Sequence, residues 1–97
     1  MMKTVLKHES FTKWFDSLKD KQIKLRIQVR IDRAEIGNYG DCEPVGEGVL
    51  ELRMTFGSGY RVYFIERGLE VIVLLAGGDK STQSNDIKKA IELSKEV

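Results

Sequence analysis

Cysteine, histidine and proline are scarce in this 97-residue sequence, which contains one of each. A single thiol, Cys42, excludes an internal disulfide and a cysteine metal cluster, and no histidine lies near it in the sequence to activate it. We therefore interpret Cys42 as structurally incidental. The single proline and the absence of any low-complexity run also exclude fibrous and disordered classes of protein.

Long apolar runs are absent as well. No window approaches the ~18 apolar residues of a membrane span, and residues 1–8 contain no apolar run of signal-peptide length. With 41% hydrophobic and 32% charged residues, the composition is typical of a soluble globular protein. We expect one cytoplasmic domain over residues 1–97, which buries about two thirds of the unfolded chain's surface on folding.

A strong excess of one charge sign is also missing. The formal net charge is +1 and the isoelectric point is about 7.8, so a basic footprint has to be sought in the distribution of charge. Residues 1–34 carry nine Lys/Arg against four Asp/Glu, residues 35–52 carry five acids and no Lys/Arg, and residues 53–97 carry seven Lys/Arg against six acids. The N-terminal excess is typical of the solvated faces of amphipathic helices, so the later cations are the ones that indicate a site.

The first third of the chain predicts a short strand and two helices. Residues 4–6 favour a strand, and Ser10 is placed to cap a helix whose apolar residues recur at helical spacing: Phe11, Trp14, Phe15 and Leu18. Residues 23–31 alternate as a half-buried strand would, but the helix formers between them and the stop signal Gly37-Asn38 favour a helix that continues to Ile36. On that helix the apolar residues form two stripes, one for the sheet and one for the first helix or a partner: Ile23, Ile27, Ile31 and Ala34 in the first, Leu25, Val29 and Ile36 in the second.

The remainder of the chain predicts a loop, three strands and a final helix. Residues 38–47 contain glycines, the proline and three acids, which is typical of a loop. Strands are expected at 49–56, 60–65 and 71–76, with turns at Gly57-Ser58-Gly59 and Arg67-Gly68 and an end at Gly77-Gly78. Ser84 or Asn85 is then expected to cap a helix with these residues inward: Ile87, Ala90, Ile91 and Leu93. The predicted class is α+β, in the order β-α-α-β-β-β-α, with an antiparallel sheet covered by helices on one face.

The other face of this predicted sheet carries the charged side chains. Alternation along residues 49–56 and 60–65 sends one set of side chains away from the core, and two more follow the last strand: Glu51, Arg53, Arg61 and Tyr63 on the face, Lys80 and Gln83 at its rim. Because a sheet covered on one side leaves its other face to water, we expect these side chains to be exposed together. Two arginines and a lysine on one surface indicate an anionic ligand.

This set of side chains suits the phosphodiester of an RNA strand. Arginine grips phosphate oxygens bidentately, lysine adds a point charge, and the rings of Tyr60 and Tyr63, with Gln83 beside them, are suited to contacting an unpaired base. Cleavage by an adjacent 2′-hydroxyl needs in-line placement, cations, a proton acceptor and a proton donor. Glu51 is our candidate for the acceptor and Lys80 for the donor, since the single histidine, His8, excludes a two-histidine mechanism.

Ordinary structural roles are the alternative. Arg53 paired with Glu51 or Glu66 across strands would be a common salt bridge of a sheet, and Tyr60 or Tyr63 a common sheet aromatic. Gly77-Gly78 before Asp79-Lys80 lacks the spacing of a Walker or dinucleotide motif. We therefore expect neither a nucleotide cofactor nor a metal ion.

A family resemblance is carried by residues along nearly the whole chain: Phe11, Trp14-Phe15, Leu18, Gly37-Asn38, Gly48-Val49, Glu51-Leu52-Arg53, Gly59-Tyr60-Arg61-Val62-Tyr63, Leu75, Gly77-Gly78-Asp79-Lys80-Ser81-Thr82-Gln83, Asp86-Ile87 and Ala90. On these residues the chain resembles the HigB-like addiction module killer proteins of the RelE/ParE toxin superfamily. The resemblance implies a small twisted antiparallel sheet with two N-terminal helices packed on it. It also implies a partner antitoxin with a helix-turn-helix domain, and ribosome-dependent cleavage of messenger RNA that inhibits translation.

The resemblance further implies roles for three residues. Arg53 matches the arginine of the first meander strand, Arg61 that of the glycine-tyrosine-arginine turn, and Lys80 the basic residue after the glycine of the last strand. Many relatives place a catalytic tyrosine or histidine near the C-terminus, where this chain has Gln83 and a polar helix. The same superfamily contains ParE-like members that poison DNA gyrase, and a non-catalytic module that binds RNA or phosphate is a third alternative.

Overall fold

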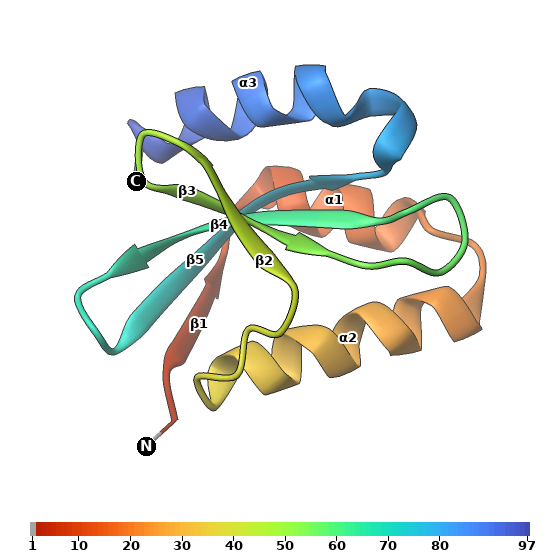
Figure 1. The fold of residues 1–97 in the computed structure, drawn as a ribbon, viewed down its shortest axis with the longest axis horizontal. Coiled ribbons are helices and arrows are strands. Elements are labelled where there is room, and N and C mark those ends of the chain that lie inside the picture. Colours follow the sequence, from red (N-terminus) through yellow and green to blue (C-terminus); the bar gives the residue numbers. More distant parts are fainter. Residues whose placement is uncertain (1) are drawn as a thin grey trace.

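The computed structural model describes residues 2–97, which form a five-stranded sheet with helices on both faces (Figure 1). The elements follow in the order β1 (Thr4–Lys7), α1 (Glu9–Ser17), α2 (Lys21–Glu35), β2 (Cys42–Gly46), β3 (Val49–Arg53), β4 (Arg61–Arg67), β5 (Val71–Gly78), the short 3-10 helix η1 (Lys80–Thr82) and α3 (Gln83–Ser94). The α+β class and the two N-terminal helices on one face of the sheet are confirmed. No helix within residues 2–97 is long and apolar enough to cross a membrane.

The strands lie in the order β1-β5-β4-β3-β2, with β1 parallel to β5 and the other neighbours antiparallel. The sheet is therefore mixed. The expectation that residues 38–47 form only a loop is wrong, because β2 pairs with β3 over Cys42–Gly46. Pro44 is tolerated in this strand because β2 lies at the edge of the sheet and needs hydrogen bonds on one side only.

Both N-terminal helices begin at side-chain caps. The cap of α1 is His8, whose Nδ1 accepts a hydrogen bond from the backbone N–H of Ser10 at 3.0 Å. The prediction that Ser10 itself is the cap is wrong, because the imidazole nitrogen of His8 reaches a free N–H of the first turn. The second helix begins after the cap Asp20 and ends before Gly37, whose φ of 86° permits the predicted helix stop.

Replacing Asp20 with alanine should lower the free energy of unfolding by about 1 kcal/mol. Oδ1 of Asp20 accepts hydrogen bonds from the N–H groups of Gln22 and Ile23, at 2.9 and 3.3 Å, and alanine would leave both donors to water. Urea denaturation followed by circular dichroism measures the change. Asp16→Ala, which removes an exposed carboxylate from α1, is the control, and an equal loss in both variants would contradict the capping role.

The sheet is covered on both faces, so the protein has two hydrophobic clusters. The first lies under α1 and α2 and includes Phe11, Ile27 and Phe64. The second lies under α3, whose inward residues are the predicted ones: Ile87, Ala90, Ile91 and Leu93. Figure 1 shows α3 on one side of the strands and α2 on the other. The expectation that the second face is left to water is therefore wrong, because the apolar stripe of α3 also needs a surface to cover it.

The boundaries of the last strand and the last helix differ from the predicted ones. The strand β5 continues through Gly77 and ends at Gly78, and α3 begins at Gln83 with no side-chain cap, not after Ser84 or Asn85. A Cβ on Gly77 would overlap the indole of Trp14, and a Cβ on Gly78 would overlap the carboxylate of Asp86. The two glycines are thus required where α1 and α3 approach β5 closely from its two faces.

Candidate functional site

Three cations from different elements lie around one corner of the sheet. Arg53 and Arg61 are register partners on β3 and β4, so their side chains leave the same face of the sheet. A Cβ on Gly59, in the β3–β4 loop, would lie 3.3 Å from Cβ of Lys80 and 3.6 Å from Nη1 of Arg61. The three cations and two neighbouring polar residues form a group that we call the corner cluster: Glu51, Arg53, Arg61, Lys80 and Gln83.

Glu51 is the most buried member of the corner cluster, with 2% of its surface exposed. Its Oε2 accepts a hydrogen bond from Nε2 of Gln83 at 2.9 Å and lies 3.8 Å from Nε of Arg61. The prediction that Glu51 faces water is wrong, because α3 packs over this part of the sheet. The geometry suits a different task, which is to hold Arg61 and Gln83 in place.

Arg61 is also largely enclosed, since 12% of its side chain is exposed. Its Nη1 donates hydrogen bonds to three carbonyl oxygens of the β3–β4 connection: those of Gly59 at 3.1 Å, Tyr60 at 3.3 Å and Met54 at 3.4 Å. A guanidinium bound in this way organises the loop. The expectation that Arg61 faces water is therefore wrong, because the loop carbonyls and Glu51 surround it.

The β3–β4 loop is held from its other side by Asp79. Oγ of Ser58 donates to Oδ2 of Asp79 at 3.0 Å, and Oδ1 of Asp79 accepts from the N–H and the hydroxyl of Ser81. The hydrogen bond from the Ser81 side chain is the main cause that lowers the pKa of the Asp79 carboxyl below its ordinary value. Sequence reasoning missed this contact because Ser58 and Asp79 are 21 residues apart. The contact helps to place Lys80, the next residue, beside Gly59.

Of the three cations in the corner cluster, Arg53 and Lys80 are more exposed to solvent than Arg61. The Arg53 side chain is 39% exposed and forms ion pairs with Asp41 at 3.7 Å and Glu43 at 3.4 Å, rather than with the partners considered from sequence. Exposed pairs of this kind contribute only about 0–1 kcal/mol, so an anionic ligand can replace them. Lys80 is exposed and has no ion-pair partner within residues 2–97.

The two tyrosines expected to contact a base lie on opposite faces of the sheet. Tyr63 has no exposed surface and packs under α3, so the prediction that it offers a stacking surface is wrong. Burial, assisted by the neighbouring Glu51 carboxylate, raises the pKa of Tyr63 far above its ordinary value, so the phenol keeps its proton. Tyr60 is half-buried on the face of α1, with its ring centroid 6.5 Å from that of Trp14.

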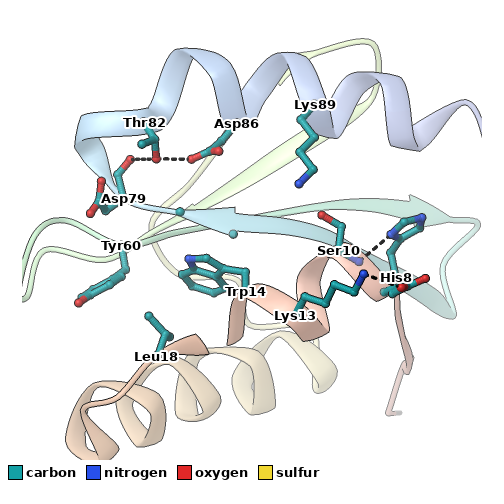
Figure 2. Close-up of a pocket in the computed structure, with 13 residues that line it drawn as sticks. His8, Ser10, Lys13, Trp14, Leu18, Tyr60, Asp79, Thr82, Asp86 and Lys89 are labelled. Carbon is teal, nitrogen blue, oxygen red and sulfur yellow. Dashed lines mark hydrogen bonds and ion pairs between the residues drawn. The ribbon is translucent and has the colours of Figure 1, made fainter. Parts of the chain in front are cut away.

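A groove of about 810 Å³ lies beside the end of β5, between α1 and α3 (Figure 2). It has an apolar part and a part lined by ionisable side chains: Trp14, Leu18 and Tyr60 in the first, His8, Glu9, Lys13, Asp79, Asp86 and Lys89 in the second. Some of this charge is paired internally, since Lys13 Nζ lies 2.9 Å from a carboxylate oxygen of Glu9 and Asp86 accepts a hydrogen bond from Thr82. Trp14 belongs to the apolar stripe predicted for the first helix, and its place in the groove wall depends on the missing side chain of Gly77.

A profile of the family described as "Phage derived protein Gp49-like (DUF891)" matches residues 13–96. The chain belongs to this Gp49-like family. An uncharacterized protein of Haemophilus influenzae is 44% identical to it over 88 residues, which cover 91% of this chain and 89% of that protein.

The Gp49-like chain has the fold of a solved toxin. The structure of E. coli toxin RelE, in the free state and with two arginines replaced by alanine, matches 95% of this chain and 97% of its own with a TM-score of 0.76. The two sequences are 13% identical, so this likeness establishes the fold alone. It confirms the RelE-like fold that the resemblance implied.

The corner cluster of the Gp49-like chain is suited to binding an anion. Arg53 presents a fork that can grip two oxygens, and Lys80 adds a point charge from the other side of the loop. Arg61, Glu51 and Gln83 form the support beneath them. Within residues 2–97 no group of three or more His, Cys, Asp or Glu side chains could hold a metal ion.

Proposed function

We propose that this Gp49-like chain is the toxin of a type II toxin–antitoxin system, and that it inhibits translation by cleaving messenger RNA on the ribosome. The proposal is supported by one combined observation: a RelE-like fold over 95% of the chain, with Arg53 and Lys80 accessible at the corner where Arg61 organises the loop. The partners in this proposal are the ribosome with its messenger RNA and a cognate antitoxin that carries a helix-turn-helix domain.

Each member of the corner cluster has a separate role in this proposal. Arg53 exchanges its exposed ion pairs for a backbone phosphate of the RNA, and Lys80 stabilises the charge that builds on phosphorus. Arg61 and Glu51 are positioning residues, because they are enclosed and hold the loop and Gln83. Tyr60, half-buried at the edge of the groove, is the aromatic ring available to a base.

The proposed reaction is an in-line displacement at phosphorus. The 2′-oxygen before the cut bonds to phosphorus while the bond to the 5′-oxygen breaks, which leaves a 2′,3′-cyclic phosphate and a 5′-hydroxyl. Lys80 donates the proton that the departing 5′-oxygen takes up. Because Glu51 is enclosed, we assign the acceptor of the 2′-hydroxyl proton to a group of the ribosome, so the purified chain alone should leave free RNA intact.

Arg53→Ala and Lys80→Ala should each lower the rate of cleavage by a factor on the order of 10² while the chain stays folded. Both side chains are exposed to solvent, so their loss should change stability by less than about 0.5 kcal/mol. Mapping transcript 5′ ends after induction of each variant measures the effect. Arg67→Ala is the matched control, because Arg67 is an exposed arginine at the opposite end of β4.

New 5′ ends inside translated frames that disappear in the Arg53 and Lys80 variants, but not in the Arg67 variant, would support the proposal. DNA breaks without new transcript ends would instead indicate a ParE-like inhibitor of DNA gyrase. Salt-dependent RNA binding without cleavage, in the presence of translating ribosomes, would indicate a non-catalytic module. Either of these last two results would overturn the proposed cleavage.

A further inference from the structure

The outer side of α2 is apolar and uncovered within residues 2–97. The helix buries one of its stripes, which contains Ile27, Ile31 and Ala34. The other stripe remains in solvent, with exposed fractions of 61% for Leu25, 39% for Val29 and 61% for Ile36. Helical spacing places these three residues along one side of α2. Their exposure excludes α1 as their cover, so a partner is the remaining alternative of the two considered from the sequence.

A groove of about 450 Å³ runs between this stripe and the end of β3. We call it the α2 groove, and its lining combines apolar and basic side chains: Leu25, Val29, Met54 and Phe56, with Arg26, Arg30, Arg33 and Arg53. Of the described residues that line it, Asp41 alone is acidic, and Asp41 is already paired with Arg53. The groove therefore offers an apolar strip beside a strong excess of positive charge.

The arginines of the α2 groove have different roles. Nη1 of Arg30 donates to the carbonyl of Arg53 at 2.7 Å, and its Nη2 donates to two carbonyls before β2 at 3.0 and 3.1 Å, so this side chain is structural. Arg26 lies over the ring of Phe56, 4.0 Å from the ring centroid. Within residues 2–97 neither Arg26 nor Arg33 has an ion-pair partner, and both are exposed. These two guanidinium groups are free to pair with carboxylates.

We propose that the α2 groove binds an acidic amphipathic helix of a partner protein. The apolar side of that helix covers Leu25 and Val29, while its Asp or Glu side chains pair with Arg26 and Arg33. An RNA strand would use the arginines but would leave the aliphatic residues exposed, since proteins stack bases on aromatic rings. Phe56, the aromatic ring in this groove, is already covered by Arg26.

Arg53 borders both the α2 groove and the corner cluster, but the residues that the proposed helix contacts lie outside the corner cluster: Leu25, Val29, Arg26 and Arg33. Recognition of an acidic helix therefore holds whether or not the chain cleaves RNA. Identifying the partner as the cognate antitoxin rests on the proposed function. A peptide-binding experiment tests the groove without that assumption.

Three synthetic helical peptides of equal length would test the site on the full chain. The first has leucines at i, i+4 and i+7 with glutamates beside them, the second has lysine in place of each glutamate, and the third keeps the glutamates but has alanine in place of each leucine. Fluorescence anisotropy should show the first peptide binding at least about tenfold more tightly than the other two. Amide chemical shifts should change along α2 and the end of β3.

Two single variants probe the two chemical features of the groove. Leu25→Ser and Arg33→Glu should each weaken binding of the first peptide at least about tenfold, and both residues are exposed, so the fold should persist. Leu69→Ser and Arg67→Glu are matched controls, because both residues are exposed near the β4–β5 turn. Neither control should alter binding.

Equal binding of the three peptides, or shift changes confined to another surface, would overturn the proposal. A single-stranded RNA oligonucleotide that binds this face and loses affinity in Arg33→Glu but not in Leu25→Ser would assign the groove to RNA instead. Sedimentation that shows a dimer, abolished by Leu25→Ser, would show that a second copy of the chain covers the stripe. Either result would overturn the proposal that a partner helix binds the α2 groove.

Discussion

Arg61→Ala should lower the free energy of unfolding by roughly 3–5 kcal/mol, a large part of the stability of a small protein. Glu51, with 2% of its surface exposed, would keep its hydrogen bond from Gln83 but lose the guanidinium that lies 3.8 Å away. An enclosed carboxylate without a cation is costly. The β3–β4 loop would also lose the three hydrogen bonds that Nη1 donates to its carbonyls. Urea denaturation of the wild type and the variant measures the difference.

The double variant Glu51→Gln/Arg61→Ala separates these two causes. Glutamine keeps an oxygen that can accept the Gln83 N–H and carries no charge, so the double variant should be more stable than Arg61→Ala alone. The difference in free energy of unfolding between the two variants measures the cost of the unpaired carboxylate. The difference that remains between the double variant and the wild type measures the contribution of the loop hydrogen bonds. A stability change below about 1 kcal/mol for Arg61→Ala, combined with loss of cleavage, would show that Arg61 acts on RNA directly and not through the loop.

Gly77→Ala should destabilise the protein by about 3 kcal/mol or more, because the added methyl overlaps the indole ring of Trp14. The effect is steric, since Gly77 is not among the residues with positive φ and alanine can adopt its backbone conformation. The strand β5 and the helix α1 would have to separate to make room. Thermal and urea denaturation both report the loss.

Removing the obstacle should recover part of that stability. In Gly77→Ala/Trp14→Ala the methyl has space, so the double variant should lose less than the sum of the two single losses, by about 1 kcal/mol or more. Gly68→Ala is the control for backbone strain, because Gly68 has a φ of 61° and nothing within 4 Å of its would-be Cβ. Strict additivity of the two substitutions would refute the clash with Trp14.

Local patterns were sufficient for some elements, even where two local signals disagreed. Residues 23–31 alternate as a strand would, yet the helix formers between the apolar residues and the stop at Gly37 correctly favoured α2. The shared face of Arg53 and Arg61 follows in the same way from the two-residue alternation of the strands on either side of the turn at residues 57–59, and their register agrees with it. Both predictions depend on neighbours in sequence, and both are confirmed.

Elements that depend on distant partners were harder to predict. The strand β2 contains Pro44 and is flanked by glycines and acids, which are loop signals, and it pairs because β3 offers its free edge. The cap of α1 is a local exception: His8 lies only two residues before Ser10, and the ring geometry lets its Nδ1 accept the hydrogen bond of the Ser10 N–H. In each case a hydrogen bond made in the folded chain outweighed the preference predicted from the local sequence.

By itself, the sequence determined which side chains share a face, because the two-residue period of a strand and the 3.6-residue period of a helix are local properties. It placed Glu51, Arg53, Arg61 and Tyr63 together, and the register agrees. Only the tertiary structure decided which of them meet water. The apolar stripe of α3 had to be buried, and it was buried on the sheet face that carries Glu51 and Tyr63. That packing divided one predicted cationic surface into an enclosed Arg61 and the accessible side chains of Arg53 and Lys80.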